Sequence, residues 1–178
     1  MFAIVLAALD RSGSVLPILC AMAVHELAHI VMMLACGGQV RRLTLRFADL
    51  QIAASGLGYR QELLSALAGP LVNLICGAAF CMQRPSFAAY SLMLGIYNLL
   101  PVWPLDGGGV LRCALLARLP ITQAEHISEI VSFAACAVLL LIGVFLTFFR
   151  KSGLWPLGTA AYLTVRLLML ARRTDAVQ

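Results

Sequence analysis

Five consecutive residues, His25-Glu26-Leu27-Ala28-His29, have the types and the spacing of a metal-dependent hydrolytic centre. On a helix, residues four apart share a face, so the imidazoles of His25 and His29 can reach one metal ion. Glu26 lies beside them, where it can take a proton from a metal-bound water and return it to a leaving amine. A metal ion lowers the pKa of its bound water to about 7, which makes hydroxide available at neutral pH.

The motif lies inside an apolar stretch, residues 14–36, that is long enough to span a membrane. A charged side chain at mid-bilayer costs about 2.5–3.5 kcal/mol on insertion scales, so ionisable residues there indicate a function. Two of the chain's three histidines stand in this stretch. A polar packing cluster or a proton relay is the alternative interpretation.

A catalytic zinc site needs a third protein ligand and an open position for water. Asp106 is a candidate because Pro101 and Pro104 precede it and three glycines, residues 107–109, follow it. Prolines break a helix, glycines allow close backbone approach, and unwound backbone at membrane depth must be buried or line a wet cavity. A plain loop in which Asp106 caps the next helix explains these residues equally well. The other candidate ligands are Asp49, Glu62, Glu125, His126 and Glu129.

Two asparagines, Asn73 and Asn98, lie in apolar stretches and are candidates for positioning a substrate backbone or polarising a carbonyl. Interhelical hydrogen bonds are the alternative explanation, because membrane bundles commonly use polar side chains in this way.

The composition places the chain in a lipid bilayer. Of its 178 residues, 62% are hydrophobic and 12% charged, whereas a soluble domain is nearer half apolar and a quarter charged. We expect one integral membrane domain, residues 1–178, with a catalytic core at about 14–119 and accessory helices at about 127–170. The net charge of +5 is spread between apolar runs, which suits lipid headgroups and predicts no nucleic-acid partner.

The fold class that follows is an all-α polytopic membrane protein with about five to six transmembrane segments. The apolar stretches that approach or reach spanning length are residues 14–36, 62–82, 86–105, 127–149 and 154–170. Residues 1–9 are apolar but too short to span alone, and they leave a sixth segment open. With loop 37–61 in the cytoplasm, eight basic residues lie on that side and four on the other, which favours this orientation.

The loop after the first long apolar stretch predicts either a β-hairpin or an amphipathic loop. Leu43, Leu45 and Phe47 alternate with other side chains, and the alternation resumes after Asp49. A hairpin here would be a short re-entrant element whose exposed edge could pair with an extended substrate by strand addition.

Three motifs, in this order, resemble those of the site-2 protease family of intramembrane zinc metalloproteases, peptidase family M50. They are His25-Glu26-x-x-His29, Ala68-Gly69-Pro70-x-x-Asn73, and Asn98-x-x-Pro101 running into Asp106-Gly107-Gly108. The resemblance covers about residues 14–119 and implies a three-helix catalytic core. It implies one Zn2+ per chain held by His25, His29 and Asp106, with Glu26 as the catalytic residue, and so favours Asp106 among the candidate third ligands.

The resemblance also implies a zinc metalloendopeptidase that hydrolyses a peptide bond in or near a membrane-associated segment of a protein substrate. The short gap between the first two motifs fits the compact members without a PDZ insertion. The residues around Asp106 are most similar to members that cleave a membrane-tethered pro-sigma factor during sporulation. We therefore expect a bacterial cytoplasmic membrane protein with its active site toward the cytoplasm, and inhibitory membrane proteins as partners.

Two departures from the family pattern concern regulation and the detail of the site. No CBS domain is expected after the last apolar stretch, and Gly109 stands where many relatives have an arginine.

Two other function classes remain. One is a catalytically inactive membrane scaffold of the same fold, against which all the residues needed for hydrolysis are present. The other is a divalent-metal transporter, which has no need of Glu26 beside the ligand pair.

Overall fold

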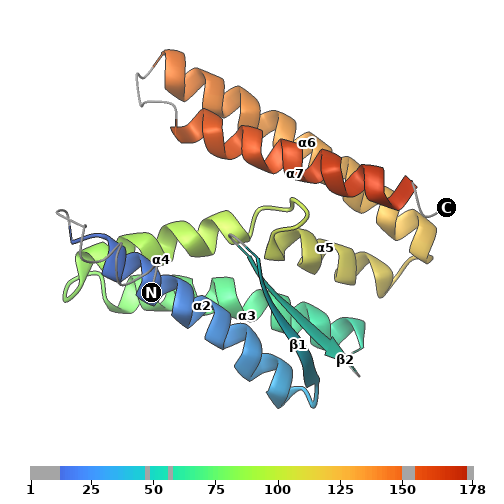
Figure 1. Cartoon of the computed structure of the whole chain (residues 1–178), viewed down its shortest axis with the longest axis horizontal. Coiled ribbons are helices and arrows are strands. Elements are labelled where there is room, and N and C mark those ends of the chain that lie inside the picture. Colours follow the sequence, from blue (N-terminus) through green and yellow to red (C-terminus); the bar gives the residue numbers. More distant parts are fainter. Residues whose placement is uncertain (1–12, 47–48, 56–57, 150–154, 176–178) are drawn as a thin grey trace. The chain divides into compact units, whose positions relative to one another are not determined.

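The computed structural model describes residues 13–46, 49–55, 58–149 and 155–175. These residues form helices and one pair of strands (Figure 1). The order is α2 (Val15–Ala35), β1 (Gln39–Arg46), β2 (Asp49–Ser55), α3 (Tyr59–Ala79), α4 (Pro85–Asn98), α5 (Asp106–Leu116), α6 (Ile121–Phe148) and α7 (Trp155–Asp175). The chain divides into two compact units, Met1–Leu99 and Leu100–Gln178, which are described separately. The expected single domain is not tested by this division and stays a prediction.

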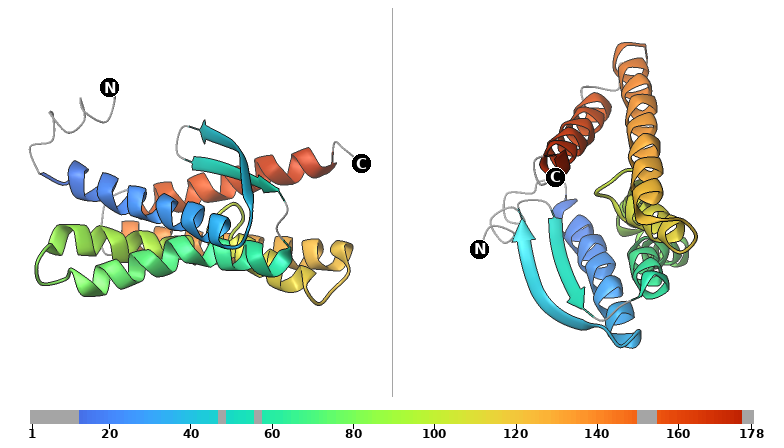
Figure 2. Two further views of the ribbon diagram at one scale, coloured as in Figure 1. Left: turned by 90° about the horizontal axis from the view of Figure 1, so that it is seen from below. Right: turned by 90° about the vertical axis from the view of Figure 1, so that its right-hand side faces the viewer.

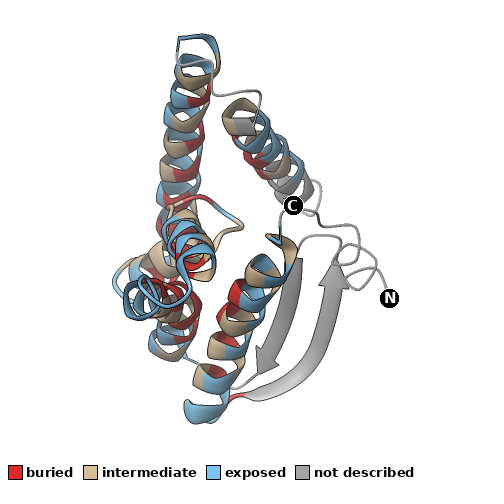
Figure 3. Ribbon diagram, turned by 90° about the vertical axis from the view of Figure 1, so that its left-hand side faces the viewer, coloured by how far each residue is buried: buried red, intermediate tan, exposed pale blue. Residues whose placement is uncertain are grey.

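In the first unit, α2, α3 and α4 pack against one another (Figure 2). Buried residues recur about every fourth position, so they share one face of each helix, whereas most outward positions are exposed (Figure 3). The exposed faces are apolar, with Leu27, Val31 and Ile75 more than half exposed, as suits contact with lipid. The buried positions are Ala21, His25, His29 and Met33 on α2, and Ser65, Gly69, Asn73 and Gly77 among those on α3.

Helices α3 and α4 approach closely because glycines stand at their contact. A Cβ added at Gly95 would lie 2.9 Å from the carbonyl oxygen of Pro70, and one at Gly77 would lie 3.1 Å from that of Ala88. Real Cβ atoms do not tolerate the first distance, and the second is tight. Small residues are what allow helix backbones to approach in a membrane.

Strands β1 and β2 pair antiparallel, with Leu43 opposite Ile52 and Leu45 opposite Leu50. For this segment the sequence left a hairpin and an amphipathic loop open, and the described backbone has two paired strands. Phe47, the third residue expected to pair with a substrate, lies outside the described residues. Whether the segment enters the membrane stays a prediction.

Gln61 ties the base of the strand segment to both flanking helices. Its Oε1 accepts a hydrogen bond from the Gly58 N–H at 2.8 Å, which satisfies a donor at the start of α3. Its Nε2 donates to the carbonyl of Cys36 at 3.1 Å, just beyond the end of α2. One side chain therefore fixes the separation of the two chain ends from which the strands extend.

In the second unit, α6 packs against α5 and α7. Its buried stripe is made of small residues four apart, Ala124, Ser128, Ser132 and Cys136, with Gly143 further along. A Cβ at Gly143 would lie 3.0 Å from the Pro156 carbonyl oxygen, so α7 begins directly against it. The Arg112 guanidinium on α5 donates to the Glu125 carboxylate on α6 at 2.5 Å, and both side chains are more than a third exposed.

Among the described residues, three helices, α2, α3 and α6, are long and apolar enough to cross a membrane. The expected stretch 86–105 does not form one helix, because α4 ends at Asn98 after 14 residues. At 1.5 Å per residue α4 is about 21 Å long, shorter than the roughly 30 Å hydrocarbon core. The chain is thus a multi-pass membrane protein, and the total of five to six segments stays a prediction.

The contact at Gly95 predicts a stability difference between two alanine substitutions. We expect Gly95→Ala to lower the free energy of unfolding by about 1–3 kcal/mol, because the added methyl meets backbone that cannot move aside. The matched control is Gly158→Ala on α7, where a Cβ would meet nothing within 4 Å and helix propensity favours alanine. Thermal unfolding in detergent measures both, and equal midpoints for the two variants would contradict the close approach.

Candidate metal centre

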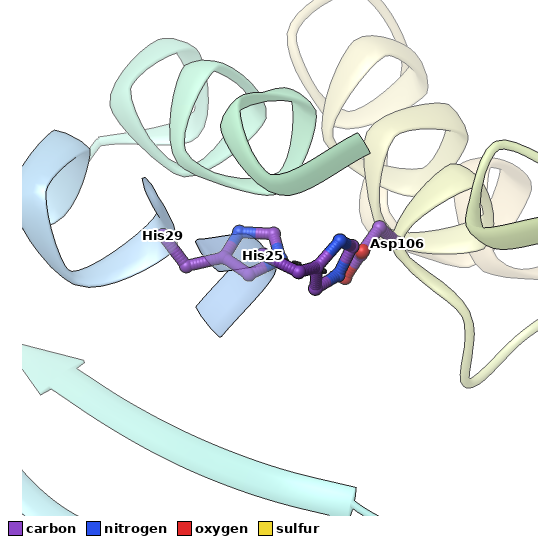
Figure 4. Close-up of side chains that lie close together, drawn as sticks. All are labelled: His25, His29 and Asp106. Atoms are coloured by element: carbon purple, nitrogen blue, oxygen red, sulfur yellow. Dashed lines mark hydrogen bonds between the residues drawn. The ribbon is translucent and has the colours of Figure 1, made fainter. Parts of the chain in front are cut away.

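The imidazoles of His25 and His29 lie on the buried face of α2, one helical turn apart. Their Nε2 atoms are 3.2 Å from each other, and the rings meet edge to face at 82° (Figure 4). The exposed fractions of the two residues are only 5% and 9%. The pair therefore presents two nitrogen atoms to one point inside the helix bundle.

The His29 ring is fixed by the backbone of α3. Its Nδ1–H donates to the carbonyl oxygen of Ser65 at 2.7 Å, and the Ser65 hydroxyl donates back to the His29 carbonyl at 3.4 Å. Because a carbonyl only accepts, the proton of the neutral ring must sit on Nδ1. Nε2 then carries the lone pair that a metal ion would use, and the backbone carbonyl is a common orienting partner of a histidine ligand.

The His25 ring meets a different partner on the same helix. Its Nδ1 lies 3.2 Å from the amide nitrogen of Asn73, which has no exposed surface. Asn73 was predicted to position a substrate, but its described contact is with the ring of His25. Both imidazoles are thus held on their Nδ1 side by residues of α3.

Gly69 provides the space in which the two rings stand. A Cβ at this position would overlap the His29 ring and come within 2.9 Å of the His25 Cε1. Any side chain at residue 69 would therefore displace one or both imidazoles. This gives the Ala68-Gly69-Pro70 motif a physical role, because it brings a bare stretch of helix against the two imidazoles.

The spacing of the imidazoles fits a shared metal ion. Two nitrogen ligands at 2.0–2.1 Å from a tetrahedral zinc are about 3.3 Å apart, close to the observed 3.2 Å. Glu26, the next residue along α2, is half-buried. Asn98 is also half-buried and is the last residue of α4.

In the second unit, Asp106 is the first residue of α5 (Figure 4). The preceding segment is irregular, and tight turns pair two of its backbone N–H groups. The Val102 N–H donates to the Leu100 carbonyl at 2.7 Å, and the Leu105 N–H donates to the Val102 carbonyl, also at 2.7 Å. Tight turns of this kind follow from Pro101 and Pro104, which end helical geometry.

Ser132 on α6 clamps the same segment. Its hydroxyl accepts the Trp103 N–H at 3.1 Å and donates to the Pro101 carbonyl at 3.5 Å. A Cβ at Gly108 would lie 2.6 Å from the Trp103 nitrogen, so α5 can rest against this backbone only with glycine there. The position of Asp106 relative to α6 is therefore set by fixed contacts.

The rival third ligands are placed differently. Glu62, His126 and Glu129 are exposed on their helices, and Glu125 is engaged with Arg112. The side chain of Asp49, on β2, lies outside the described part of the chain.

Comparisons with known proteins bear on this arrangement. Residues 84–142 match the model of Peptidase family M50. The chain is 28% identical over 138 residues to stage IV sporulation protein FB of Bacillus subtilis, covering 70% of this chain and 47% of that protein. It is 26% identical over 133 residues to a zinc metalloprotease of Methanocaldococcus jannaschii, covering 67% and 39%. The chain thus spans less than half the length of each of these curated relatives.

A solved structure extends the likeness to the fold. The site-2 protease from Methanocaldococcus jannaschii superposes with a TM-score of 0.68 at 19% identity, covering 94% of this chain and 83% of that chain. The resemblance to peptidase family M50 is confirmed. The M50 match contains Asn98 and Asp106, whereas His25 and His29 lie before it.

Sequence reasoning named the residues of the M50-like motifs but missed the residues that hold them. It gave no role to Ser65 or to Ser132. It also did not recognise that Gly69 leaves space for the two rings. The signal that could have found them is the recurrence of small residues every four positions on α3 and α6, beginning at Ser65 and at Ala124. Such a stripe marks the face on which a partner helix or loop comes close.

The space at Gly69 predicts the effect of a single methyl group. We expect Gly69→Ala to reduce metal bound per chain severalfold, because the methyl and the imidazoles cannot occupy the same volume. Elemental analysis of detergent-purified protein measures this, with Gly158→Ala as the control substitution. Wild-type metal content in Gly69→Ala would contradict the described placement of the rings.

The clamp at Ser132 predicts a local loosening. Ser132→Ala removes both hydrogen bonds, at about 1 kcal/mol each, and leaves the Trp103 N–H without its acceptor. We expect faster hydrogen exchange at the Trp103 amide, measured by mass spectrometry or NMR. Ser128→Ala, one turn earlier on the same buried stripe, should leave that amide unchanged. Equal exchange in both variants would show that Ser132 does not hold the segment.

Proposed function

We propose that this chain is an intramembrane zinc endopeptidase that hydrolyses a peptide bond in or near a membrane-associated segment of a protein substrate. The observation that carries the proposal is the pair of buried Nε2 atoms 3.2 Å apart on a membrane-spanning helix. An ordinary packing histidine needs one partner, whereas these two rings are each held at Nδ1 and turned toward a common point. That arrangement suits a shared metal ion.

The ligand set we propose is His25, His29 and Asp106, which offers two imidazoles and one carboxylate. This donor set suits zinc, and two histidines with one carboxylate recur in catalytic zinc sites that keep a position open for water. We propose one zinc per chain. When bound, such an ion supplies Lewis acidity toward a carbonyl oxygen and acidifies a water molecule.

Glu26 is the residue we assign to proton transfer. Its carboxylate follows His25 directly on α2 and is half-buried, so it stands beside the ligand pair without occupying the same helix face. It takes a proton from the attacking water and returns it to the leaving amine, which is the work of a general base and acid. Asn98, at the end of α4, is assigned to hold the substrate backbone.

The substrate we propose is a membrane-tethered protein. A helical segment hides its peptide groups in its own hydrogen bonds, so the scissile bond must be extended before cleavage. The β1–β2 pair lies in the chain next to α2, and an outer strand edge at Leu43 and Leu45 suits pairing with an extended segment. The similarity to stage IV sporulation protein FB makes a pro-sigma factor the substrate to try first. We further propose a bacterial cytoplasmic membrane location, a site facing the cytoplasm, and control by inhibitory membrane proteins.

The test separates metal binding from chemistry in one set of variants. Wild type and Glu26→Gln should each hold about one zinc per chain, and Asp106→Ala should lose it. Cleavage of a reporter with one membrane-embedded segment should fall by about 10²–10⁴ in Glu26→Gln, because the amide cannot accept the proton. Glu129→Gln makes the same chemical change at an exposed position and should cleave like the wild type.

Other outcomes would overturn specific parts of the proposal. Normal cleavage by Glu26→Gln would remove it as the base. Zinc kept in Asp106→Ala but lost in His126→Ala would replace the third ligand. Zinc flux into proteoliposomes without cleavage would favour a transporter, and wild type without zinc or cleavage would favour a scaffold.

A further inference from the structure

Asn73 has a fully buried side-chain amide, and only one of its two polar atoms has a hydrogen-bond partner among the described residues. Its nitrogen lies 3.2 Å from the Nδ1 of His25, while its Oδ1 has no hydrogen-bond partner among the described residues. A buried unsatisfied acceptor costs about 1–3 kcal/mol, so a native protein that keeps one has a reason. The relevant neighbour is the ring of a proposed metal ligand.

The hydrogen-bond partners indicate which ring nitrogen of each histidine carries a proton. His29 carries its proton on Nδ1, because that atom faces the Ser65 carbonyl. If the Asn73 amide donates N–H to the Nδ1 of His25, the His25 proton must sit on Nε2. It then points at the Nε2 of His29, 3.2 Å away. In this arrangement the His25 proton lies between the two Nε2 atoms, so one metal ion cannot bind both of them.

Metal binding requires the opposite arrangement at His25. Both Nε2 lone pairs must be free, so the His25 proton has to move to Nδ1, which faces Asn73. An N–H of the amide cannot face that N–H. A half-turn of the amide about its Cβ–Cγ bond exchanges nitrogen and oxygen at nearly the same positions. In either orientation one polar atom of the amide has no hydrogen-bond partner among the described residues, so the same side chain can partner either tautomer of His25.

We propose that Asn73 is a positioning residue that stabilises the metal-binding tautomer of His25 when the ion is bound. In the loaded site its Oδ1 accepts the His25 Nδ1–H and directs the Nε2 lone pair toward the ion, as the Ser65 carbonyl does for His29. In the empty site the same amide donates instead. An amide suits both states because it has a donor and an acceptor, whereas a fully buried carboxylate would carry an unpaired charge when no metal is bound.

This inference rests on the proposed zinc site, and its test uses zinc affinity instead of cleavage. The full-length protein in detergent is titrated with zinc against a chromophoric chelator. Asn73→Leu keeps the branched shape but removes the acceptor, and should lower zinc affinity by about 10–100-fold. Asn73→Asp keeps an acceptor and removes the donor, and should bind zinc as tightly as the wild type or more tightly.

The aspartate variant distinguishes this role from a structural one. If the amide served only by donating N–H, Asn73→Asp would lose affinity as Asn73→Leu does, and the proposal would be wrong. Ser91→Ala is the control. It removes another fully buried side-chain oxygen that has no hydrogen-bond partner among the described residues, and it should keep wild-type affinity. If thermal unfolding shows that Asn73→Leu does not fold, the zinc affinity of Asn73→Asp relative to the wild type still tests the proposal.

Failure of the zinc site and failure of this inference give different results. Wild type without bound zinc would overturn both the proposed function and the role of Asn73. Zinc in the wild type with unchanged affinity in a folded Asn73→Leu would leave the function standing and overturn only the inference.

Discussion

The arrangement of the candidate site depends on how closely α3 can lie against the histidine face of α2. Within a bilayer no bulk water is available to satisfy the outer nitrogen of an imidazole, so a neighbouring helix must do it. Ser65 and Asn73 meet the two rings eight residues apart on α3, and the bare backbone of Gly69 lies between them. A larger residue at this position would separate the helices and remove both partners at once.

The same constraint extends to the other helix contacts of each unit. Gly95 and Gly77 let α4 approach α3, and Gly143 lets α7 approach α6. Without a strong hydrophobic force between helices in lipid, such contacts depend on packing and on a few polar bonds. Small residues therefore carry much of the architecture, while the large apolar side chains that would form the core of a soluble protein are exposed on the outer faces.

The irregular segment before Asp106 finds hydrogen-bond partners within the second unit. Unwound backbone needs such partners wherever water does not reach its N–H groups. Those of Val102 and Leu105 are satisfied by tight turns, and that of Trp103 by the hydroxyl of Ser132. The segment can thus be rigid without being helical, which is what the proposed role of Asp106 as a metal ligand requires if its position is to be fixed before metal binds.

The sequence by itself determined the membrane class, the helix that carries the histidine motif and the resemblance to peptidase family M50. These follow from composition, from a four-residue spacing and from motif order, all of which are local properties of the chain. It also marked Asp106, although its own residues left a helix cap equally plausible. It did not place the end of α4, because hydropathy alone does not distinguish a helix from the apolar turns of Pro101 and Pro104.

Only the tertiary structure decided what touches the two imidazoles. The partner of His29 is a backbone carbonyl, which has no side-chain signature in any sequence. The partner of His25 is Asn73, which the sequence shows only as a polar residue in an apolar stretch. Which residue of α2 its side chain meets depends on the register between α2 and α3. Two contacts set that register. One joins residues that are 36 positions apart in the sequence, and the other joins residues 48 positions apart. The periodicity along one helix carries no information about such contacts.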